Sequence, residues 1–303
     1  MILSIGEILF DVFPKYRRIG GAPFNFAHHL KGLGFPVRFV SRVGKDENGW
    51  KILSLLEKAG FRSEDVQIDP AHPTGTVAVD LDDQGIPQFT IRQEVAYDHL
   101  TFDESIGEIL DERPSLIYYG SLIQRTDPGF STLHQILSHR HRQSRCLYDM
   151  NLRPGCGKPR LIERSLQEAD ILKLNDEELK TAAEMFGLSA DGADAAAAMM
   201  PRFGLSMVAL TRGAEGSELY VGRDRFGTAA PKPSSVADTV GAGDAYTAML
   251  AAGILEGWGP ERILSTAARF ASRICSIEGA IPEDMEFYRD FRREMKGSAN
   301  DGA

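Results

Sequence analysis

Short apolar runs that alternate with helical segments constrain the fold of this chain most strongly. The runs lack the alternation of a half-exposed strand, so they suit strands that are covered on both faces. They are Ile2–Ile5, Val37–Val43, Leu116–Tyr119, Cys146–Met150, Ile171–Leu174 and Met207–Thr211. The segments between them carry helix punctuation, such as Pro23 at a start and Gly34 at an end. We therefore expect an α/β fold in which helices cover both faces of a mostly parallel central sheet, giving three α/β/α layers.

One stretch breaks this alternation. Residues 74–92 read TGTVAVDLDDQGIPQFTIR, which is two alternating strands around a turn at Asp82–Gly85 with no helix behind them. An antiparallel hairpin inserted into an α/β domain is typical of a lid over a site, although a plain extension of the sheet is the alternative. No repeat or linker divides the chain. We expect one domain over residues 1–303, with lid strands at about 10–19 and 74–95.

Composition excludes several classes of protein. The formal charge is −9, from 43 acidic against 34 basic residues, which argues against a nucleic-acid partner. The 3 cysteines show neither a zinc spacing nor a disulfide framework, so a reducing compartment is expected. The N-terminal run carries Glu7 and Asp11 and lacks a basic region, unlike a signal peptide. No apolar run is long enough to span a membrane. The prediction is a cytoplasmic protein.

The run DTVGAGDA, residues 238–245, is the most informative for function. A small, apolar helix is expected to begin near Ala242, and Gly241 and Gly243 leave backbone N–H groups uncovered at its positive end. Such an end binds anions, phosphate above all. A carboxylate beside a phosphate is useful when it takes a proton from an attacking hydroxyl, and Asp244 stands in that place. The run predicts phosphoryl transfer with Asp244 as the base and Gly241–Gly243 as the anion hole.

Two other phosphate-binding motifs are absent. A Walker A loop ends in Gly-Lys-Ser/Thr, whereas Gly44-Lys45 is followed by Asp46 and Gly157-Lys158 by Pro159. A dinucleotide-binding fingerprint requires a third glycine, and Tyr246 stands at that position. A nucleotide-dependent oxidoreductase is therefore a remote alternative.

With this run the chain resembles the PfkB (ribokinase-like) family of carbohydrate kinases, whose signature is Asp-Thr-x-Gly-Ala-Gly-Asp. GEILFDVFP (6–14) and RIGGAPFNFAHHLKGLG (18–34) are similar to the family's first signature. The resemblance implies that Asp11 and Asn25 bind sugar hydroxyls and that Gly20-Gly21 forms the bend between lid and core. It also implies ATP as the phosphoryl donor. Paired glycines fit such a bend because they permit close backbone approach.

Further motifs extend the resemblance. NDEE, from Asn175 to Glu178, is similar to the family's Asn-x-x-Glu, which implies Mg²⁺ held through water, as suits an ion that dehydrates reluctantly. TRGAEGS (211–217) resembles the turn that lines the nucleotide phosphates, implying roles for Thr211, Gly213 and Gly216. DMNLRP (149–154) implies that Arg153 reaches the substrate or the phosphate. IEGAIP (277–282) places Gly279 near the adenine pocket, and with the Asp238 stretch it implies an optional K⁺ loop.

Within the family the motifs are closest to bacterial fructokinases, on PTGTV and GIPQF in the lid, VAYD (95–98) and GSLIQR (120–125). 2-Keto-3-deoxygluconate kinases and ribokinases remain alternatives, and Arg92 and Arg153 are candidates to bind a sugar acid. A nucleoside kinase would need an apolar slot, for which Phe24, Phe26 and Phe89 are available; Phe89 is also a candidate sugar contact. A non-catalytic sugar- or nucleotide-binding regulator is a further alternative. Exposed strand edges of the lid favour a homodimer formed through it.

Overall fold

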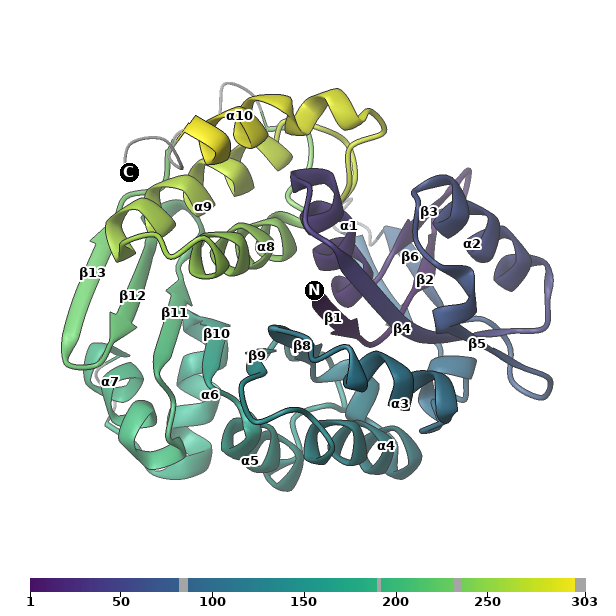
Figure 1. Ribbon diagram of the computed structural model, residues 1–303, viewed down its shortest axis with the longest axis horizontal. Coiled ribbons are helices and arrows are strands. Elements are labelled where there is room, and N and C mark those ends of the chain that lie inside the picture. Colours follow the sequence, from purple (N-terminus) through teal and green to yellow (C-terminus); the bar gives the residue numbers. More distant parts are fainter. Residues whose placement is uncertain (82–86, 190–191, 232–235, 298–303) are drawn as a thin grey trace.

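The computed structural model describes residues 1–81, 87–189, 192–231 and 236–297 of the chain. Its main sheet has 9 strands in the order β13-β12-β11-β10-β9-β8-β1-β4-β5 (Figure 1). The strands from β11 to β5 run parallel to one another, and only β12 and β13 at one edge are antiparallel. Their bounds are β1 Ile2–Ile5, β4 Val37–Gly44, β5 Val66–Asp69, β8 Leu116–Gly120, β9 Arg145–Asp149, β10 Ile171–Asn175, β11 Met207–Thr211, β12 Ser217–Val221 and β13 Asp224–Thr228.

Helices cover both faces of this sheet (Figure 1). One face carries α1 (Ala22–Leu33), α2 (Glu47–Lys58), α8 (Ala242–Leu255), α9 (Pro260–Ile274) and α10 (Arg289–Gly297). The other face carries α3 (Glu104–Asp111), α4 (Asp127–Ser138), α5 (Pro159–Glu168), α6 (Asp176–Phe186) and α7 (Gly192–Phe203). The predicted α/β/α layering with a mostly parallel sheet is confirmed.

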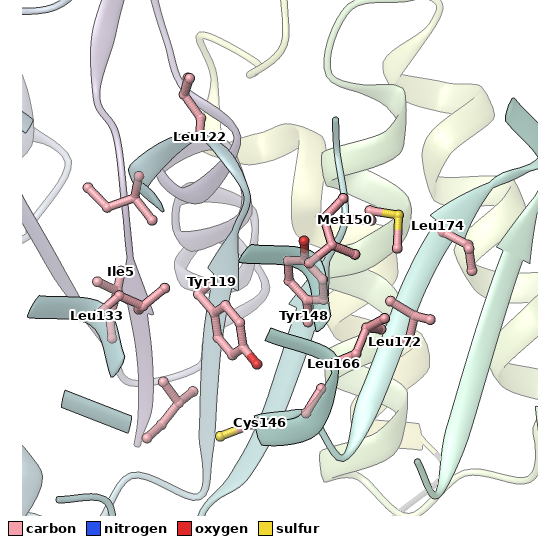
Figure 2. Packing of buried hydrophobic residues seen from close by; sticks show 14 of the residues in the cluster. Ile5, Tyr119, Leu122, Leu133, Cys146, Tyr148, Met150, Leu166, Leu172 and Leu174 are labelled. Carbon is pink, nitrogen blue, oxygen red and sulfur yellow. The ribbon is translucent and has the colours of Figure 1, made fainter. Parts of the chain in front are cut away.

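Two hydrophobic cores fill the spaces between the layers. On the α3–α7 side, Tyr119 and Tyr148 from adjacent strands stack with ring centroids 5.2 Å apart, and Leu133 and Leu166 pack around them (Figure 2). On the other side, α8 packs between α1 and α9, and its small side chains allow this close approach. Burial on both faces explains why the central strands read as continuous apolar runs in the sequence.

A second sheet of 4 strands, in the order β3-β2-β6-β7, stands beside the main one. Its strands are β2 Leu9–Val12, β3 Arg17–Gly20, β6 Thr76–Leu81 and β7 Pro87–Ile91. β6 and β7 pair in antiparallel fashion, as expected for the hairpin at 74–92. The turn expected at Asp82–Gly85 lies outside the described residues. Among the helices that the structure describes, none is long and apolar enough to cross a membrane.

Asp46 joins the start of α2 to the segment that enters the small sheet at β6. Its Oδ1 accepts hydrogen bonds from the Gly49 N–H (2.8 Å) and the Thr74 hydroxyl (2.6 Å), while Oδ2 accepts from the Thr74 N–H (2.8 Å). Burial raises the pKa of Asp46, but these hydrogen bonds outweigh it and hold that pKa below its usual range. Asp46 is therefore ionised in the folded protein.

We expect Asp46→Ala to lower the free energy of unfolding by roughly 1–3 kcal/mol, since it removes a cap and leaves the buried Thr74 N–H unpaired. Because the pKa is lowered in the folded state, the difference from wild type should shrink as pH falls through the pKa of the folded state. Urea unfolding at several pH values measures this. Asp284→Ala, which removes only the cap of the short helical turn η5 (Met285–Tyr288), is the control with a smaller expected loss. Equal losses for both variants would contradict the linking role of Asp46.

Candidate active site

The first turn of α8 presents unpaired N–H groups beside a carboxylate. Gly241 caps the helix at φ 79°, and a Cβ there would lie 2.4 Å from the Cβ of Ala280, so only glycine fits. The Ala242 N–H donates to the Thr239 carbonyl (3.3 Å). In the described part of the chain, no acceptor faces the N–H groups of Gly243 and Asp244. These two amides, at the positive end of the helix, are available to the anion predicted to bind at 241–243.

Asp244 faces α1 across this turn. Its Oδ2 accepts a hydrogen bond from Asn25 Nδ2 (2.8 Å), although the two residues are far apart in the sequence. Burial raises the pKa of Asp244 to about 6; the Asn25 hydrogen bond lowers it, Asp149 raises it, and Lys173 and Arg153 lower it. A carboxyl group with this pKa is deprotonated at neutral pH and still basic enough to accept a proton.

A buried ion pair lies next to Asp244. Lys173 in β10 is aligned with Asp149 in β9, and Nζ lies 3.1 Å from Asp149 Oδ1. The other carboxylate oxygen, Oδ2, accepts a hydrogen bond from the Thr247 hydroxyl (2.9 Å) on α8. Burial lowers the pKa of Lys173, but Asp149, Glu178 and Asp244 outweigh this and raise it. Lys173 is therefore a fixed positive charge near Gly243, from whose would-be Cβ its Nζ lies 3.5 Å.

Two more carboxyl groups face the same region from the chain's first strands. Glu7, which follows β1, is almost fully buried, and its Oε2 has no hydrogen-bond partner among the described residues. Burial raises the pKa of Glu7 to about 7 and that of Asp11 in β2 to about 6. The Arg153 guanidinium lowers the pKa of Glu7, Asp11 and Asp244 alike. Arg153, which is exposed, is thus near all three carboxyl groups.

Gly20 and Gly21 permit this convergence. A Cβ on Gly20 would lie 2.8 Å from Asp11 Oδ2, and one on Gly21 would lie 2.5 Å from the Glu7 carbonyl oxygen. Gly21 also has φ 113°, which side-chain-bearing residues rarely adopt. The pair therefore brings β3 of the lid, the Glu7 backbone and the start of α1 together, as the bend predicted there requires.

A cavity of 460 Å³ opens on the other side of the first turn of α8. Thr211, Gly213, Gly216 and Gly243, all predicted from the sequence to bind nucleotide, line it. Gly216 has φ 108°, and a Cβ there would lie 2.0 Å from the Thr228 carbonyl oxygen. The remaining wall is mainly small and apolar, and includes Ala214, Val236, Tyr246, Ala268, Ala271 and Cys275. The cavity joins a polar floor suited to phosphate with apolar walls suited to a flat base.

Asn175 and Glu178 form a reciprocal cap at the start of α6. Asn175 Oδ1 accepts from the Glu178 N–H (2.8 Å), and Glu178 Oε2 accepts from the Asn175 N–H (2.8 Å). Glu178 Oε1 also accepts from the Leu152 N–H (2.8 Å). Both side chains are held by these bonds, so they suit a hydrated Mg²⁺ bound through its waters, and the donor set fits that ion.

Gly279 does not line the cavity among the described residues. Its N–H donates to Asp238 Oδ2 (3.1 Å), and it has φ 81°. Arg18 of β3 reaches this loop, with an ion pair of 2.6 Å to Glu278 and one of 3.7 Å to Asp238. The IEGAIP loop therefore contacts β3 of the small sheet, and Arg18 supplies positive charge to Glu278 and to the neighbouring Asp238.

The aromatic candidates lie elsewhere. Phe24 and Phe26 are buried in the core, where Phe24 packs on Phe39 and Phe26 stacks on Tyr118. They cannot form the apolar slot that a nucleoside would need. Phe89 lies on β7 with 54% of its surface exposed. Arg92, after β7, is exposed as well, and its carbonyl accepts a hydrogen bond from Arg125.

Comparison with known proteins decides the family. The sequence profile of the pfkB family carbohydrate kinases matches residues 15–286. The chain belongs to the PfkB family of carbohydrate kinases. It is 30% identical to a fructokinase of Rhizobium leguminosarum bv. trifolii, covering 84% of this chain and 79% of the relative. It is 27% identical to a fructokinase of Salmonella typhimurium, covering 96% and 98%. The crystal structure of an uncharacterized sugar kinase PH1459 from Pyrococcus horikoshii in complex with ATP superposes with a TM-score of 0.82 at 26% identity, covering 97% and 100%.

Membership of this kinase family agrees with the prediction made from DTVGAGDA and with the predicted ribokinase-like fold. Lys173 and Glu7 were missed as site residues. Each carried a signal, because Lys173 is a lone cation inside the apolar run ILKLN and Glu7 a lone acid inside ILSIGEILF. Burying a charged side chain costs free energy unless another group pairs with it or binds to it. The apolar walls of the cavity could not be predicted from the sequence. They are formed by small residues of α9 and by Val236, and such residues look the same in a sequence as ordinary core residues.

Glu7→Gln is expected to stabilise the protein at alkaline pH. A folded-state pKa of about 7, against 4.5 without burial, means that folded protein keeps a proton that the unfolded chain has lost. Wild-type stability should therefore fall as pH rises from the lower value to the higher, by up to about 3 kcal/mol. Urea unfolding near pH 4 and near pH 8 should give equal stabilities at the lower pH and a more stable variant at the higher. The exposed Glu256→Gln is the control, and a parallel pH dependence in wild type and Glu7→Gln would contradict the argument.

Proposed function

We propose that this enzyme transfers the γ-phosphoryl group of ATP to a hydroxyl of fructose. The observation that carries the proposal is the position of Asp244. Its carboxyl group is held by Asn25 and stands beside the unpaired N–H groups at the start of α8. The preceding residue, Gly243, lines the 460 Å³ cavity, while Asp244 itself interacts electrostatically with Glu7 and Arg153. A base between a nucleotide-sized cavity and a polar, sugar-sized region is what phosphoryl transfer to an alcohol requires.

In this mechanism Asp244 removes the proton from the sugar hydroxyl as the oxygen attacks the γ-phosphorus. The bond between that phosphorus and the β–γ bridging oxygen breaks, and ADP leaves with the electron pair. The Gly243 and Asp244 amides and the Lys173 ammonium stabilise charge on the phosphoryl oxygens. Mg²⁺ associated with Asn175 and Glu178 would neutralise the negative charge of the ATP phosphates.

The small sheet supplies the sugar contacts and excludes water. Asp11 on β2 and Asn25 on the neighbouring helix α1 bind sugar hydroxyls, and Phe89 on β7 offers an apolar face for the ring on closure. Closure matters because water in the site would accept the phosphoryl group and waste ATP. The ion pairs of Arg18 with Glu278 and Asp238 hold the lid against the loop behind the anion site.

A sugar acid such as 2-keto-3-deoxygluconate is the second candidate substrate. The observation in its favour is Arg153, which is exposed yet close enough to lower the pKa of Glu7, Asp11 and Asp244. A guanidinium in that position is suited to a carboxylate. Fructose is preferred because two relatives that match most of this chain are named fructokinase.

A coupled assay for ADP release tests the proposal. Purified protein with Mg-ATP is offered fructose, 2-keto-3-deoxygluconate, ribose, glucose and adenosine in turn. Turnover with fructose as the best substrate supports the proposal, and turnover with the sugar acid supports the second candidate. Folded protein that binds ATP and releases ADP with none of them would point to a non-catalytic regulator and contradict the proposal.

The pH profile provides a further prediction. Activity with the preferred sugar should rise with pH through about 6 as the Asp244 carboxyl loses its proton. The hydrogen bond from Asn25 stabilises the ionised form of Asp244. Removing it in Asn25→Leu should therefore move this rise to higher pH. Initial rates under saturating ATP from acid to neutral pH measure the shift. An unmoved profile would show that another group limits the rate.

We also propose that the lid edges pair two copies into a homodimer. β3 and β7 are the edges of the small sheet, and unpaired strand edges readily bind a second chain. Size-exclusion chromatography with light scattering decides it, since a single 33.3 kDa species would exclude the dimer.

A further inference from the structure

Two segments meet where the β6–β7 hairpin leaves and rejoins the main sheet. The first runs from the end of β5 at Asp69, past His72, into β6. The second runs from β7, past Glu94, to a short helical turn, η2 (Ala96–His99). They lie side by side, because the Ala96 N–H donates to the Pro73 carbonyl (2.8 Å). Neither segment belongs to the kinase site described above.

Metal-binding side chains converge at this junction. His72, Glu94 and His99 each offer one ligand atom, and these atoms lie within 4.8 Å of one another. Among the described residues, this is the one such group of histidine, cysteine and acidic side chains. His99 Nε2 and Glu94 Oε2 are 3.6 Å apart, too far for a good hydrogen bond. Two ligands of one tetrahedral ion lie roughly this far apart, given metal–ligand distances of about 2.0–2.2 Å.

His99 has a nitrogen that the protein does not use. Its Nε2 is buried and has no hydrogen-bond partner in the described part of the chain. Its ring stacks on that of His72, with centroids 3.6 Å apart and planes 11° apart. The nitrogen lone pairs lie in the ring planes, so one ring has to turn out of this stack before both can reach a single ion. A neutral imidazole nitrogen is a metal ligand.

Asp69 fixes the orientation of the His72 ring. Asp69 Oδ2 lies 3.1 Å from His72 Nδ1, while Oδ1 accepts from the N–H groups of Ala71 (2.8 Å) and His72 (2.9 Å). The carboxylate is almost fully buried and also pairs with Arg42 (2.9 Å). A His72 that donates from Nδ1 leaves the lone pair of Nε2 free. Carboxylate–histidine pairs of this kind support the ligands of many zinc sites.

We propose that His72, His99 and Glu94 bind a divalent transition-metal ion of the Zn²⁺ class, with water completing the coordination. Because Asp69 holds His72, the His99 ring is the one that turns out of the stack to share an ion with His72 and Glu94. Two imidazoles and one carboxylate suit Zn²⁺ better than Mg²⁺, which prefers oxygen ligands. The ion clamps the segments that enter and leave the lid hairpin, and so stiffens the base of the lid.

The test uses the full chain, with any affinity tag removed and metal stripped by chelator. ZnCl₂ is titrated against wild type in competition with a chromophoric chelator, beside His72→Ala, His99→Ala and Glu94→Gln. We expect one tight site per chain in wild type. The histidine variants should bind at least about 100-fold more weakly, and Glu94→Gln roughly 10-fold or more. His139→Ala, which removes an exposed histidine that is not part of the cluster, is the control and should bind as wild type does.

A second readout keeps the test independent of folding defects in any one variant. Zn²⁺ should raise the unfolding temperature of wild type and of His139→Ala but not of His99→Ala, since a ligand that binds only the folded state stabilises it. Without metal, Glu94→Gln should unfold as wild type does, because this exposed side chain packs against little. Stoichiometric binding that survives all three substitutions, or wild-type affinity no better than that of the histidine variants, would overturn the proposal.

Discussion

Asp244→Asn is expected to lower the turnover number by about 10²–10⁴-fold while leaving ATP and sugar binding nearly intact. Asparagine has the same shape, but its amide cannot accept the proton of the sugar hydroxyl. Its oxygen can still accept the hydrogen bond from Asn25, so the first turn of α8 keeps its place. The substitution also removes a negative charge beside the γ-phosphate, so ATP should bind as well as before or better. A loss in turnover number with an unchanged or lower KM therefore identifies a group that acts in the transition state.

Steady-state rates with the preferred sugar, and ATP affinity by calorimetry, measure the two effects separately. Asp224→Asn, on the exposed edge strand β13, is the matched control and should have wild-type rates. Two results would contradict the assignment. One is a variant that retains more than about a tenth of the wild-type rate. The other is a variant whose loss lies wholly in ATP affinity, which would make Asp244 a binding group.

The layers of the fold could be predicted because burial leaves a direct mark on the sequence. Strands such as β8 and β9 are covered on both faces, so their apolar composition alone predicts that they lie inside the sheet between two helical layers. Helix ends could be predicted as well: Pro23 lies in the first turn of α1, and Gly34 ends that helix in the left-handed conformation. These are local effects of a few neighbouring residues, which a single sequence records.

The site was only partly predictable for the opposite reason. The glycines of the anion site were legible because a positive φ and a close approach demand glycine, as at Gly241 and Gly216. The Asn25–Asp244 hydrogen bond joins residues 219 positions apart, and no local pattern records such a pairing. The same holds for the pairing of Asp149 with Lys173 and Thr247, which depends on the register of β9 with β10 and on the packing of α8. Phe24 and Phe26 show the opposite error. They stand next to a motif and were candidates for a ligand-binding slot, yet both are buried in the core.

Lys173→Met is expected to lower the free energy of unfolding by about 3–5 kcal/mol, because it leaves a buried carboxylate without its cation. Asp149 is 0% exposed and Lys173 6%, so water cannot replace the lost partner. The hydrogen bond from Thr247 remains, but it satisfies only one of the two oxygens of Asp149. The loss should appear in urea unfolding of the protein without ligands. Lys180→Met, on the exposed side of α6, is the matched control and should change stability by less than about 0.5 kcal/mol.

The double variant Lys173→Met/Asp149→Asn separates stability from catalysis. Removing the negative charge as well eliminates the uncompensated carboxylate, so most of the stability should return. The asparagine can still accept the hydrogen bond from the Thr247 hydroxyl, and this bond keeps α8 attached to the end of β9. Activity should not return, because the ammonium that stabilises the phosphoryl oxygens near Gly243 is still missing. A double variant that recovers both stability and turnover would show that Lys173 serves the fold alone, and that the helix amides suffice for the transferring phosphate.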